Sequence, residues 1–300
     1  MSIVGNYTAL ITPFFKNQEI DYGSLRKLIK FQVQNSDGIV ALGSTAEATM
    51  LDNYEKHKIM EHITSLTEKK IKIIAGINAF SLQDAIHQSH QRFIDGADAL
   101  LISPPPYIKP SKNGLIAFYK TLADQSYIPI ILYNIPSRTG IHIPLDIIKE
   151  LSLHENIIGI KEASGDISLG VSISSLVNEQ FSLLAGNDNI YIPLLSLGAT
   201  GIISVIGNIL PNICKQTTDL YLSNRQTEAK KLYHSYINII NSLSLESNPI
   251  CIKYILSELN IIKPYFRKPL CMPTLKNRKQ LKLEIENIKN KLELPLKYLT

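Results

Sequence analysis

Lys161 has the sequence setting that most clearly suggests chemistry. It lies in the apolar run Ile157–Ala163, where a charged ammonium group is costly to bury. Burial therefore favours the neutral amine, which is the form that attacks a ketone and forms a Schiff base. With strict alternation along a strand, Lys161 shares a face with Ile157 and Gly159, and the glycine leaves room beside it. The structural alternative is a lysine that extends from the strand end into solvent.

A tyrosine and an arginine follow the preceding apolar run. That run ends in Tyr133 and continues as Asn-Ile-Pro-Ser-Arg-Thr-Gly. A phenol at a strand end can move protons during imine and enamine chemistry. Pro136 and Gly140 predict a turn that presents Arg138, whose guanidinium group suits a carboxylate. Tyr133 alone is more typical of a packed aromatic residue, and the flanking turn favours the functional interpretation.

Repeated strand and helix patterns position these residues. Eight short apolar runs, rich in β-branched residues, occur at Val4–Ile11, Ile39–Gly43, Ile71–Ile77, Ala97–Ser103, Ile128–Asn134, Ile157–Ala163, Phe181–Gly186 and Gly201–Ile206. Helical spacing separates them at Tyr22–Gln34, Tyr54–Thr67, Leu82–Ile94, Leu115–Asp124, Pro144–Leu151, Ile167–Leu176 and Ile190–Leu197. Continuous apolar strands alternating with helices are typical of a covered parallel sheet, and eight units predict an α/β fold, the (β/α)8 TIM barrel. The active site of such a barrel lies where the strands end, which is where Lys161 and Tyr133 stand.

The last quarter of the chain has a different pattern. From residue 225 onward it shows helical periodicity over Gln226–Leu243, Pro249–Leu259 and Asn277–Leu292, without a further strand pattern. We therefore expect a catalytic barrel over residues 1–224 and a C-terminal helical domain over residues 225–300, packed together as one unit.

Composition excludes several other classes of protein. The 300 residues are 45% hydrophobic and carry a net charge of +5, with acidic and basic residues interspersed, which argues against a nucleic-acid partner. The sequence lacks an apolar stretch of 18 residues and a signal-peptide pattern, so we expect no membrane partner and a cytoplasmic location. The widely spaced Cys214, Cys251 and Cys271 argue against a disulfide framework or a zinc site. His87 and His90 form only a helical pair, so no metal is expected.

Three motifs carry a resemblance to a known family. They are Gly-Ser-Thr-Ala-Glu at residues 43–47, Tyr-Asn-Ile-Pro-Ser-Arg-Thr-Gly at 133–140 and Gly-Ile-Lys-Glu-Ala-Ser-Gly at 159–165. The chain resembles the dihydrodipicolinate synthase and N-acetylneuraminate lyase superfamily over nearly its whole length. Its Pro-Ser-Arg-Thr-Gly segment resembles the synthase branch. This resemblance implies a lyase of the class I aldolase type that condenses pyruvate with aspartate semialdehyde, in lysine and diaminopimelate biosynthesis.

The resemblance also implies a role for individual residues. Lys161 matches the lysine that forms the imine with pyruvate, and Tyr133 matches the general acid and base. Ser44 stands where the family commonly has threonine; it keeps the hydroxyl group, so a relay of Ser44, Tyr133 and Tyr107 to solvent is expected. The expected substrate-binding residues are Thr45 for the pyruvate carboxylate, Arg138 for the semialdehyde carboxylate, and Gly186 and Ile203 near the imine.

The same resemblance implies partners and cofactors. Tyr107 matches a residue that reaches into the neighbouring subunit's site, which implies at least a dimer and, by family habit, a homotetramer. The imine forms on Lys161 itself, so neither a metal nor an organic cofactor is expected.

Some residues depart from the family pattern. Ala46 replaces a common glycine, so the loop after the second strand is expected to be slightly reshaped. Lys56 and Phe80 occupy positions that match the lysine feedback site of bacterial and plant enzymes, and both are poor hosts for free lysine. We therefore expect weak or absent inhibition by L-lysine.

Two other functions are consistent with part of the pattern. Another pyruvate-dependent aldolase of the superfamily, such as a 2-keto-3-deoxygluconate or N-acetylneuraminate lyase, would share Lys161 and Tyr133, but Arg138 argues against it. A non-catalytic barrel, used for binding or regulation, would make Lys161 merely structural.

Overall fold

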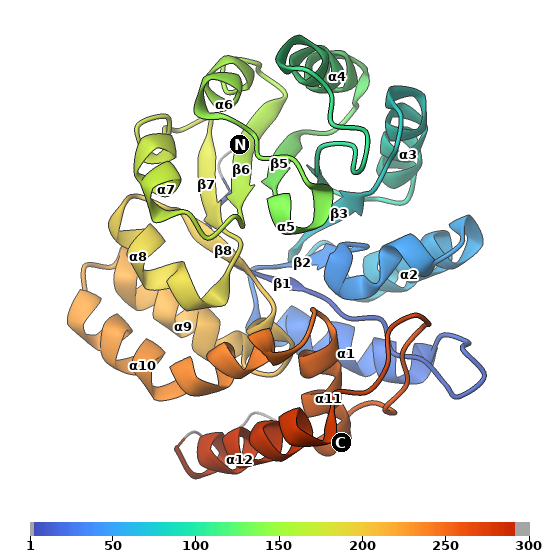
Figure 1. Cartoon of the computed structure of the whole chain (residues 1–300), viewed down its shortest axis with the longest axis vertical. Helices are drawn as coiled ribbons and strands as arrows, with labels where there is room; N and C mark the ends of the chain where they lie inside the picture. Colours follow the sequence, from blue (N-terminus) through green and yellow to red (C-terminus); the bar gives the residue numbers. More distant parts are fainter. Residues whose placement is uncertain (1–2, 292–300) are drawn as a thin grey trace.

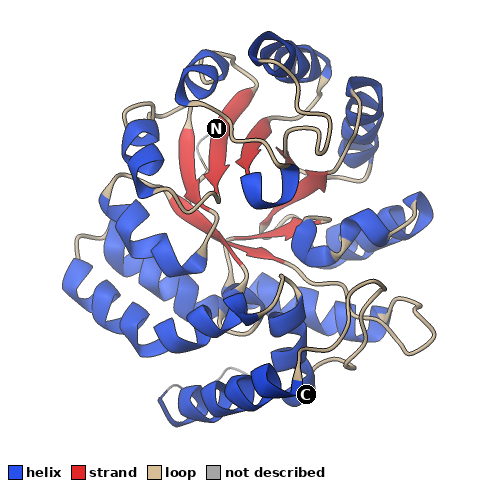
Figure 2. Ribbon diagram, viewed as in Figure 1, coloured by secondary structure: helices blue, strands red, loops and turns tan. Residues whose placement is uncertain are grey.

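The computed structural model describes residues 3–291 and shows a closed barrel of parallel strands at its centre (Figure 2). The strands pair in chain order, and β8 closes on β1. They are β1 (Gly5–Ala9), β2 (Gly38–Ala41), β3 (Lys72–Ile77), β4 (Ala99–Ile102), β5 (Ile130–Asn134), β6 (Ile157–Glu162), β7 (Ser182–Ala185) and β8 (Gly201–Ser204). Each overlaps one of the eight apolar runs, so the predicted (β/α)8 barrel is confirmed.

Helices surround the barrel and cover its outer face (Figure 1). They are α1 (Tyr22–Asn35), α2 (Asn53–Thr67), α3 (Leu82–Ile94), α4 (Lys112–Gln125), α5 (Pro136–Thr139), α6 (Leu145–Leu151), α7 (Ile167–Ser174), α8 (Tyr191–Ser196), α9 (Pro211–Leu222), α10 (Gln226–Ser242), α11 (Ile250–Glu258) and α12 (Leu275–Lys291). Single 3-10 turns are η1 (Ser44–Ala46), η2 (Ala48–Met50), η3 (Asp188–Ile190), η4 (Ile206–Asn208) and η5 (Leu243–Leu245). Helices α5 and α9 are not among the helices expected from the sequence.

Local capping fixes where several helices begin. The Asp52 side chain accepts a hydrogen bond from the Glu55 amide at 2.8 Å, and the Glu55 carboxylate accepts one from the Asp52 amide at 3.0 Å. This capping box satisfies two amides at the start of α2. Helices α3, α4 and α7 have a simpler cap, in which the side chain of Ser81, Ser111 or Asp166 accepts one hydrogen bond from a backbone amide of the first turn. The path of each loop from strand to helix is therefore set by nearby residues.

Apolar side chains cover both faces of the barrel strands. The larger layer joins outward-facing strand residues, such as Leu132 and Ile160, to the surrounding helices. A smaller layer fills the barrel with inward-facing residues, among them Ile131, Tyr133 and Ile203. Because both layers are apolar, the strands are buried on both faces, and an inward-facing Lys161 is an exception.

An irregularity in β6 changes the expected alternation. Ile130 of β5 pairs with Ile157, but the next residue, Ile131, pairs with Gly159, so β6 contains one extra residue. Ile157 belongs to the outer layer and Ile158 to the inner one. The expectation that Lys161 shares a face with Ile157 is therefore wrong, whereas Gly159 does lie on the Lys161 side.

Helices α10 to α12 follow the barrel and lie along one side of it (Figure 1). Helix α10 packs on α9, and α12 contacts α10 and α11. The last predicted helix begins two residues earlier than expected, and its expected end at Leu292 lies outside the described residues. None of the helices within residues 3–291 has the length and apolar character needed to cross a membrane.

Candidate active site

A cavity of about 620 Å³ opens at the end of the barrel where the strands finish. Six of the expected residues line it: Ser44, Thr45, Tyr133, Arg138, Lys161 and Gly186. They come from the ends of four strands and the loops that follow, because parallel strands bring their C-terminal ends to one rim. The cavity also receives residues from the segment between α10 and α11.

Lys161 and Tyr133 are side by side in the barrel wall. They are direct register partners on β6 and β5, and the Lys161 Nζ lies 4.3 Å from the centre of the Tyr133 ring. Lys161 is only 5% exposed and Tyr133 only 8%. The Lys161 amine thus points into the barrel beside a phenol, which is the geometry that Schiff-base chemistry with proton transfer requires.

A buried carboxylate completes the floor of the cavity. The Asp188 carboxylate accepts hydrogen bonds from the Ser204 hydroxyl at 2.5 Å and from the Val205 amide at 2.9 Å. Burial raises the pKa of Asp188, whereas these bonds and the nearby charge of Lys161 oppose that rise. These hydrogen bonds hold the Asp188 side chain in one orientation in the cavity wall.

Polar groups at the rim form a second cluster. Thr45 is buried, and its hydroxyl accepts a hydrogen bond from the Asn248 side-chain amide at 2.9 Å. The Arg138 guanidinium donates to the Asn248 carbonyl at 2.5 Å. Asn248 thus connects a hydroxyl and a guanidinium group that come from different strand ends. Both are groups that bind carboxylates.

The loop after β2 accommodates the alanine that replaces a common glycine of the family. Ala46 is buried without a left-handed backbone, so alanine fits this position. The left-handed residue is Glu47, with φ of 57°. The turn that carries Ser44 and Thr45 therefore depends on how the Glu47 side chain is held.

Two of the expected site residues lie apart from the cavity wall. Ile203 is fully buried in the inner layer with Tyr133. Tyr107 is 90% exposed, although its amide bonds to the Thr139 carbonyl at 3.4 Å, next to Arg138. A hydroxyl relay through Tyr107 is thus not assembled within this one chain, and it stays a prediction.

The chain matches one family model almost from end to end. The model of the dihydrodipicolinate synthetase family covers residues 2–288. The chain belongs to the dihydrodipicolinate synthetase family. The resemblance seen in the three motifs is thereby confirmed, and the chain is an enzyme, a lyase of the class I aldolase type.

Relatives within the dihydrodipicolinate synthetase family match over the same length. The 4-hydroxy-tetrahydrodipicolinate synthase of Methanococcus aeolicus is 38% identical over 296 residues, which is 98% of each chain. The solved structure of the synthase from Methylacidiphilum fumariolicum has a TM-score of 0.94 at 35% identity and covers 97% of this chain and 98% of that one. The structure of the chloride-inhibited synthase from Acinetobacter baumannii, complexed with pyruvate, has a TM-score of 0.93 at 35% identity and covers 96% and 99%.

Sequence reasoning about this family member missed several polar residues of the cavity, Asp188 and Asn248 among them. Asp188 follows Gly186 at the end of β7, so the rule that polar residues closing a strand form the site could have found it. Asn248 lies 44 residues beyond Ser204, the end of β8, and no local pattern connects it to the barrel mouth. Only the packing of the C-terminal helices brings it there.

Proposed function

We propose that the chain catalyses the reaction for which its curated relatives are named, 4-hydroxy-tetrahydrodipicolinate synthesis, from pyruvate and L-aspartate 4-semialdehyde. The observation that carries this proposal is the Lys161 amine, 5% exposed, packed on the Tyr133 ring at the barrel mouth. The Acinetobacter baumannii synthase was solved with pyruvate, which supports pyruvate as the first substrate here. The end product serves lysine and diaminopimelate biosynthesis.

Lys161 makes and breaks the covalent bonds. Its neutral Nζ attacks the pyruvate ketone, and loss of water leaves a protonated imine. Removal of a methyl proton gives an enamine, whose carbon adds to the aldehyde of the second substrate. The amino group of that substrate then attacks the imine carbon, closes the ring and releases Lys161 as the free amine. The chain needs no external cofactor for these steps, because the imine itself accepts the electrons.

The cavity residues divide the remaining tasks. Tyr133 delivers and removes protons, with Ser44 and the Tyr107 hydroxyl as the path to solvent. Thr45 binds the pyruvate carboxylate and Arg138 binds the carboxylate of the semialdehyde. Gly186 lines the cavity near the imine, and Ile203 packs with Tyr133 in the apolar layer inside the barrel.

Reduction with borohydride tests the covalent step. Pyruvate and borohydride together should add a reduced three-carbon acid to Lys161, located by peptide mapping, whereas Lys161→Arg should acquire none. An unmodified Lys161 peptide would refute the proposal and favour a non-catalytic barrel.

The choice of second substrate rests on Arg138. Arg138→Ala should retain the trapped adduct but lose at least about tenfold in kcat/KM for the semialdehyde, because a hydrogen-bonded charge pair is removed. Equal turnover of sugar acids by the unaltered enzyme would instead favour a 2-keto-3-deoxygluconate or N-acetylneuraminate lyase.

The proposal includes an assembly and a location. Tyr107 has φ of 75° and projects from the surface, which supports a role in a neighbouring subunit's site and a homotetramer. Sedimentation equilibrium should give a mass near four chains. The three free cysteines support a reducing compartment, and we assign the enzyme to the cytoplasm.

A further inference from the structure

A buried ion pair lies behind the turn that carries Ser44 and Thr45. The Lys253 ammonium of α11 pairs with the Glu47 carboxylate, and the two side chains are 1% and 0% exposed. The Lys253 Nζ also lies 4.4 Å from the Phe14 ring centre and 5.0 Å from that of Phe266. Burial lowers the pKa of Lys253 to about 8. A pair this deeply buried contributes little net stability but fixes the position of the groups around it.

A segment far along the chain reaches the same carboxylate. We call residues 260–274, between α11 and α12, the C-terminal strap. Its Arg267 amide donates to the second oxygen of Glu47 at 3.0 Å. Figure 1 shows the strap beside the segment that precedes α1. Glu47 is therefore held by α11 through its charge and by the strap through a backbone hydrogen bond.

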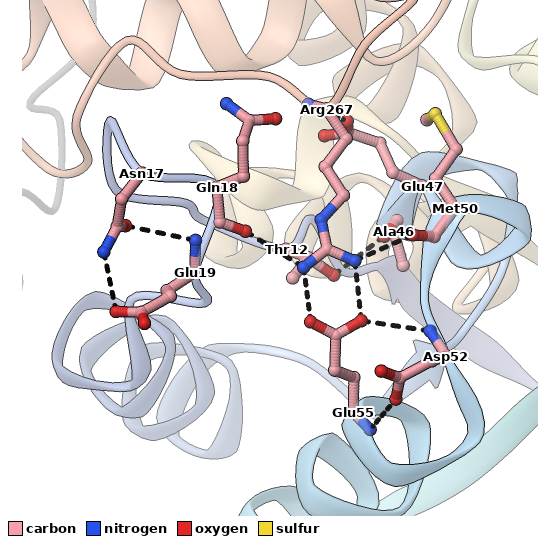
Figure 3. A network of polar contacts seen from close by, with 10 residues as sticks. All are labelled: Thr12, Asn17, Gln18, Glu19, Ala46, Glu47, Met50, Asp52, Glu55 and Arg267. Carbon is pink, nitrogen blue, oxygen red and sulfur yellow. Dashed lines mark hydrogen bonds and ion pairs between the residues drawn. The ribbon is translucent and has the colours of Figure 1, made fainter.

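The Arg267 side chain binds the strap to the loop before α1 and to the loop between β2 and α2 (Figure 3). Its guanidinium donates to the Met50 carbonyl at 2.7 Å and to the Gln18 carbonyl at 2.9 Å. It also donates hydrogen bonds to both carboxylate oxygens of Glu55, one of them at 2.6 Å. This bond to Arg267 is the largest cause of a lowered Glu55 pKa. Such a fork has a fixed direction, so it determines where the strap lies.

The turn has other supports as well, including the bond from the Asn248 side-chain amide to the Thr45 hydroxyl at 2.9 Å. Glu47 adopts a left-handed backbone that L residues avoid, and its amide bonds to the Ser44 carbonyl at 3.2 Å. The Ala46 carbonyl accepts a hydrogen bond from the Thr12 hydroxyl at 2.8 Å. Thr45 is two residues from the Glu47 carboxylate, so a shift of Glu47 moves the Thr45 amide and hydroxyl directly.

We propose that Arg267 is a positioning residue, which acts through Glu47 to hold Thr45 where it receives the carboxylate of pyruvate. The C-terminal strap thereby sets the affinity for the first substrate without touching it. This inference rests on the proposed function. Small displacements of a binding group weaken binding strongly, because its donors lose their alignment with the carboxylate.

Arg267→Lys tests the proposal. Lysine keeps the positive charge, but its single ammonium group cannot hydrogen-bond at the same time to the Glu55 carboxylate and to the Met50 and Gln18 carbonyls. The pyruvate concentration that gives half-maximal borohydride trapping, and the KM for pyruvate, should each rise about tenfold. The kcat at saturating pyruvate and the KM for the semialdehyde should stay within about twofold. The control is Arg225→Lys, because Arg225 also forms a two-point contact with a carboxylate, that of Glu228 at 2.7 and 2.6 Å, on the exposed surface and away from the cavity.

A second variant, Glu47→Gln, tests the same inference in case Arg267→Lys does not fold. Glu47→Gln keeps the side-chain volume and an acceptor for the Arg267 amide, and Lys253 can shed its proton, so this variant should fold. It loses the ion pair that holds the Glu47 side chain against α11, so the KM for pyruvate should rise selectively here too. An unchanged KM for pyruvate in both variants would overturn the inference, as would a fall in kcat with both KM values rising together. Failure of the unaltered enzyme to form any adduct would instead overturn the proposed function, together with this inference.

Discussion

Replacement of Tyr133 separates its two contributions to catalysis. Tyr133→Phe keeps the ring that lies 4.3 Å from the Lys161 Nζ and removes only the hydroxyl group. Loss of an acid and base slows proton transfer, so kcat should fall about 10²- to 10⁴-fold. Imine occupancy at equilibrium should change little, since a proton-transfer catalyst alters rates alone. Tyr133→Leu also removes the ring face beside the Lys161 nitrogen. The protonated imine then loses a cation–π contact worth about 1–2 kcal/mol, which corresponds to roughly tenfold weaker imine formation.

Two measurements on the same preparations distinguish these effects. Borohydride trapping after full equilibration with pyruvate reports imine occupancy, and steady-state turnover reports kcat. Thermal melts followed by circular dichroism control for the lost packing, because Tyr133 is only 8% exposed. A kcat of Tyr133→Phe within about threefold of the unaltered enzyme would refute the proton-transfer role. Equal imine occupancy in the phenylalanine and leucine variants would refute the electrostatic contribution of the ring.

Three further predictions concern stability and regulation. A methyl group on Gly186 would lie 2.4 Å from the nearest side chain, so Gly186→Ala should lower the free energy of unfolding by about 1–3 kcal/mol in urea melts, unlike Gly43→Ala, whose nearest atom is 3.9 Å away. Burial raises the pKa of Tyr7 to about 12 from 10.0, so between these values the unfolded chain loses this proton while the folded chain keeps it. Stability should therefore fall as pH rises above about 10, and Tyr7→Phe should reduce that fall in denaturation measured at several pH values. L-lysine should inhibit weakly or not at all, because Lys56 and the 61% exposed Phe80 do not suit its charged groups; millimolar lysine that halves the rate in a steady-state assay would contradict this.

Local patterns predicted most of the scaffold and the reactive residues. Continuous apolar runs predicted the eight strands, since parallel strands buried on both faces are mostly apolar. An isolated lysine in such a run predicted a covalent role, and strand-end position predicted that Lys161, Tyr133 and Arg138 line one cavity. Helix α9 was not predicted, although it follows the eighth strand as a helix follows each strand of such a barrel.

Only the tertiary structure decided which groups support the reactive pair. Asn248 and Arg267 meet the β2–α2 turn through hydrogen bonds that span about 200 residues of sequence, and no local periodicity encodes such contacts. The orientation of Lys161 likewise depends on the extra residue in β6, which lets Ile157 face outward beside Ile130 while Lys161 faces inward beside Tyr133. Strand alternation is a property of one segment, whereas a bulge is chosen by the pairing of two strands. The sequence by itself therefore determined the barrel and its reactive amine, and the packed chain determined the direction in which that amine points and the residues that hold its substrate.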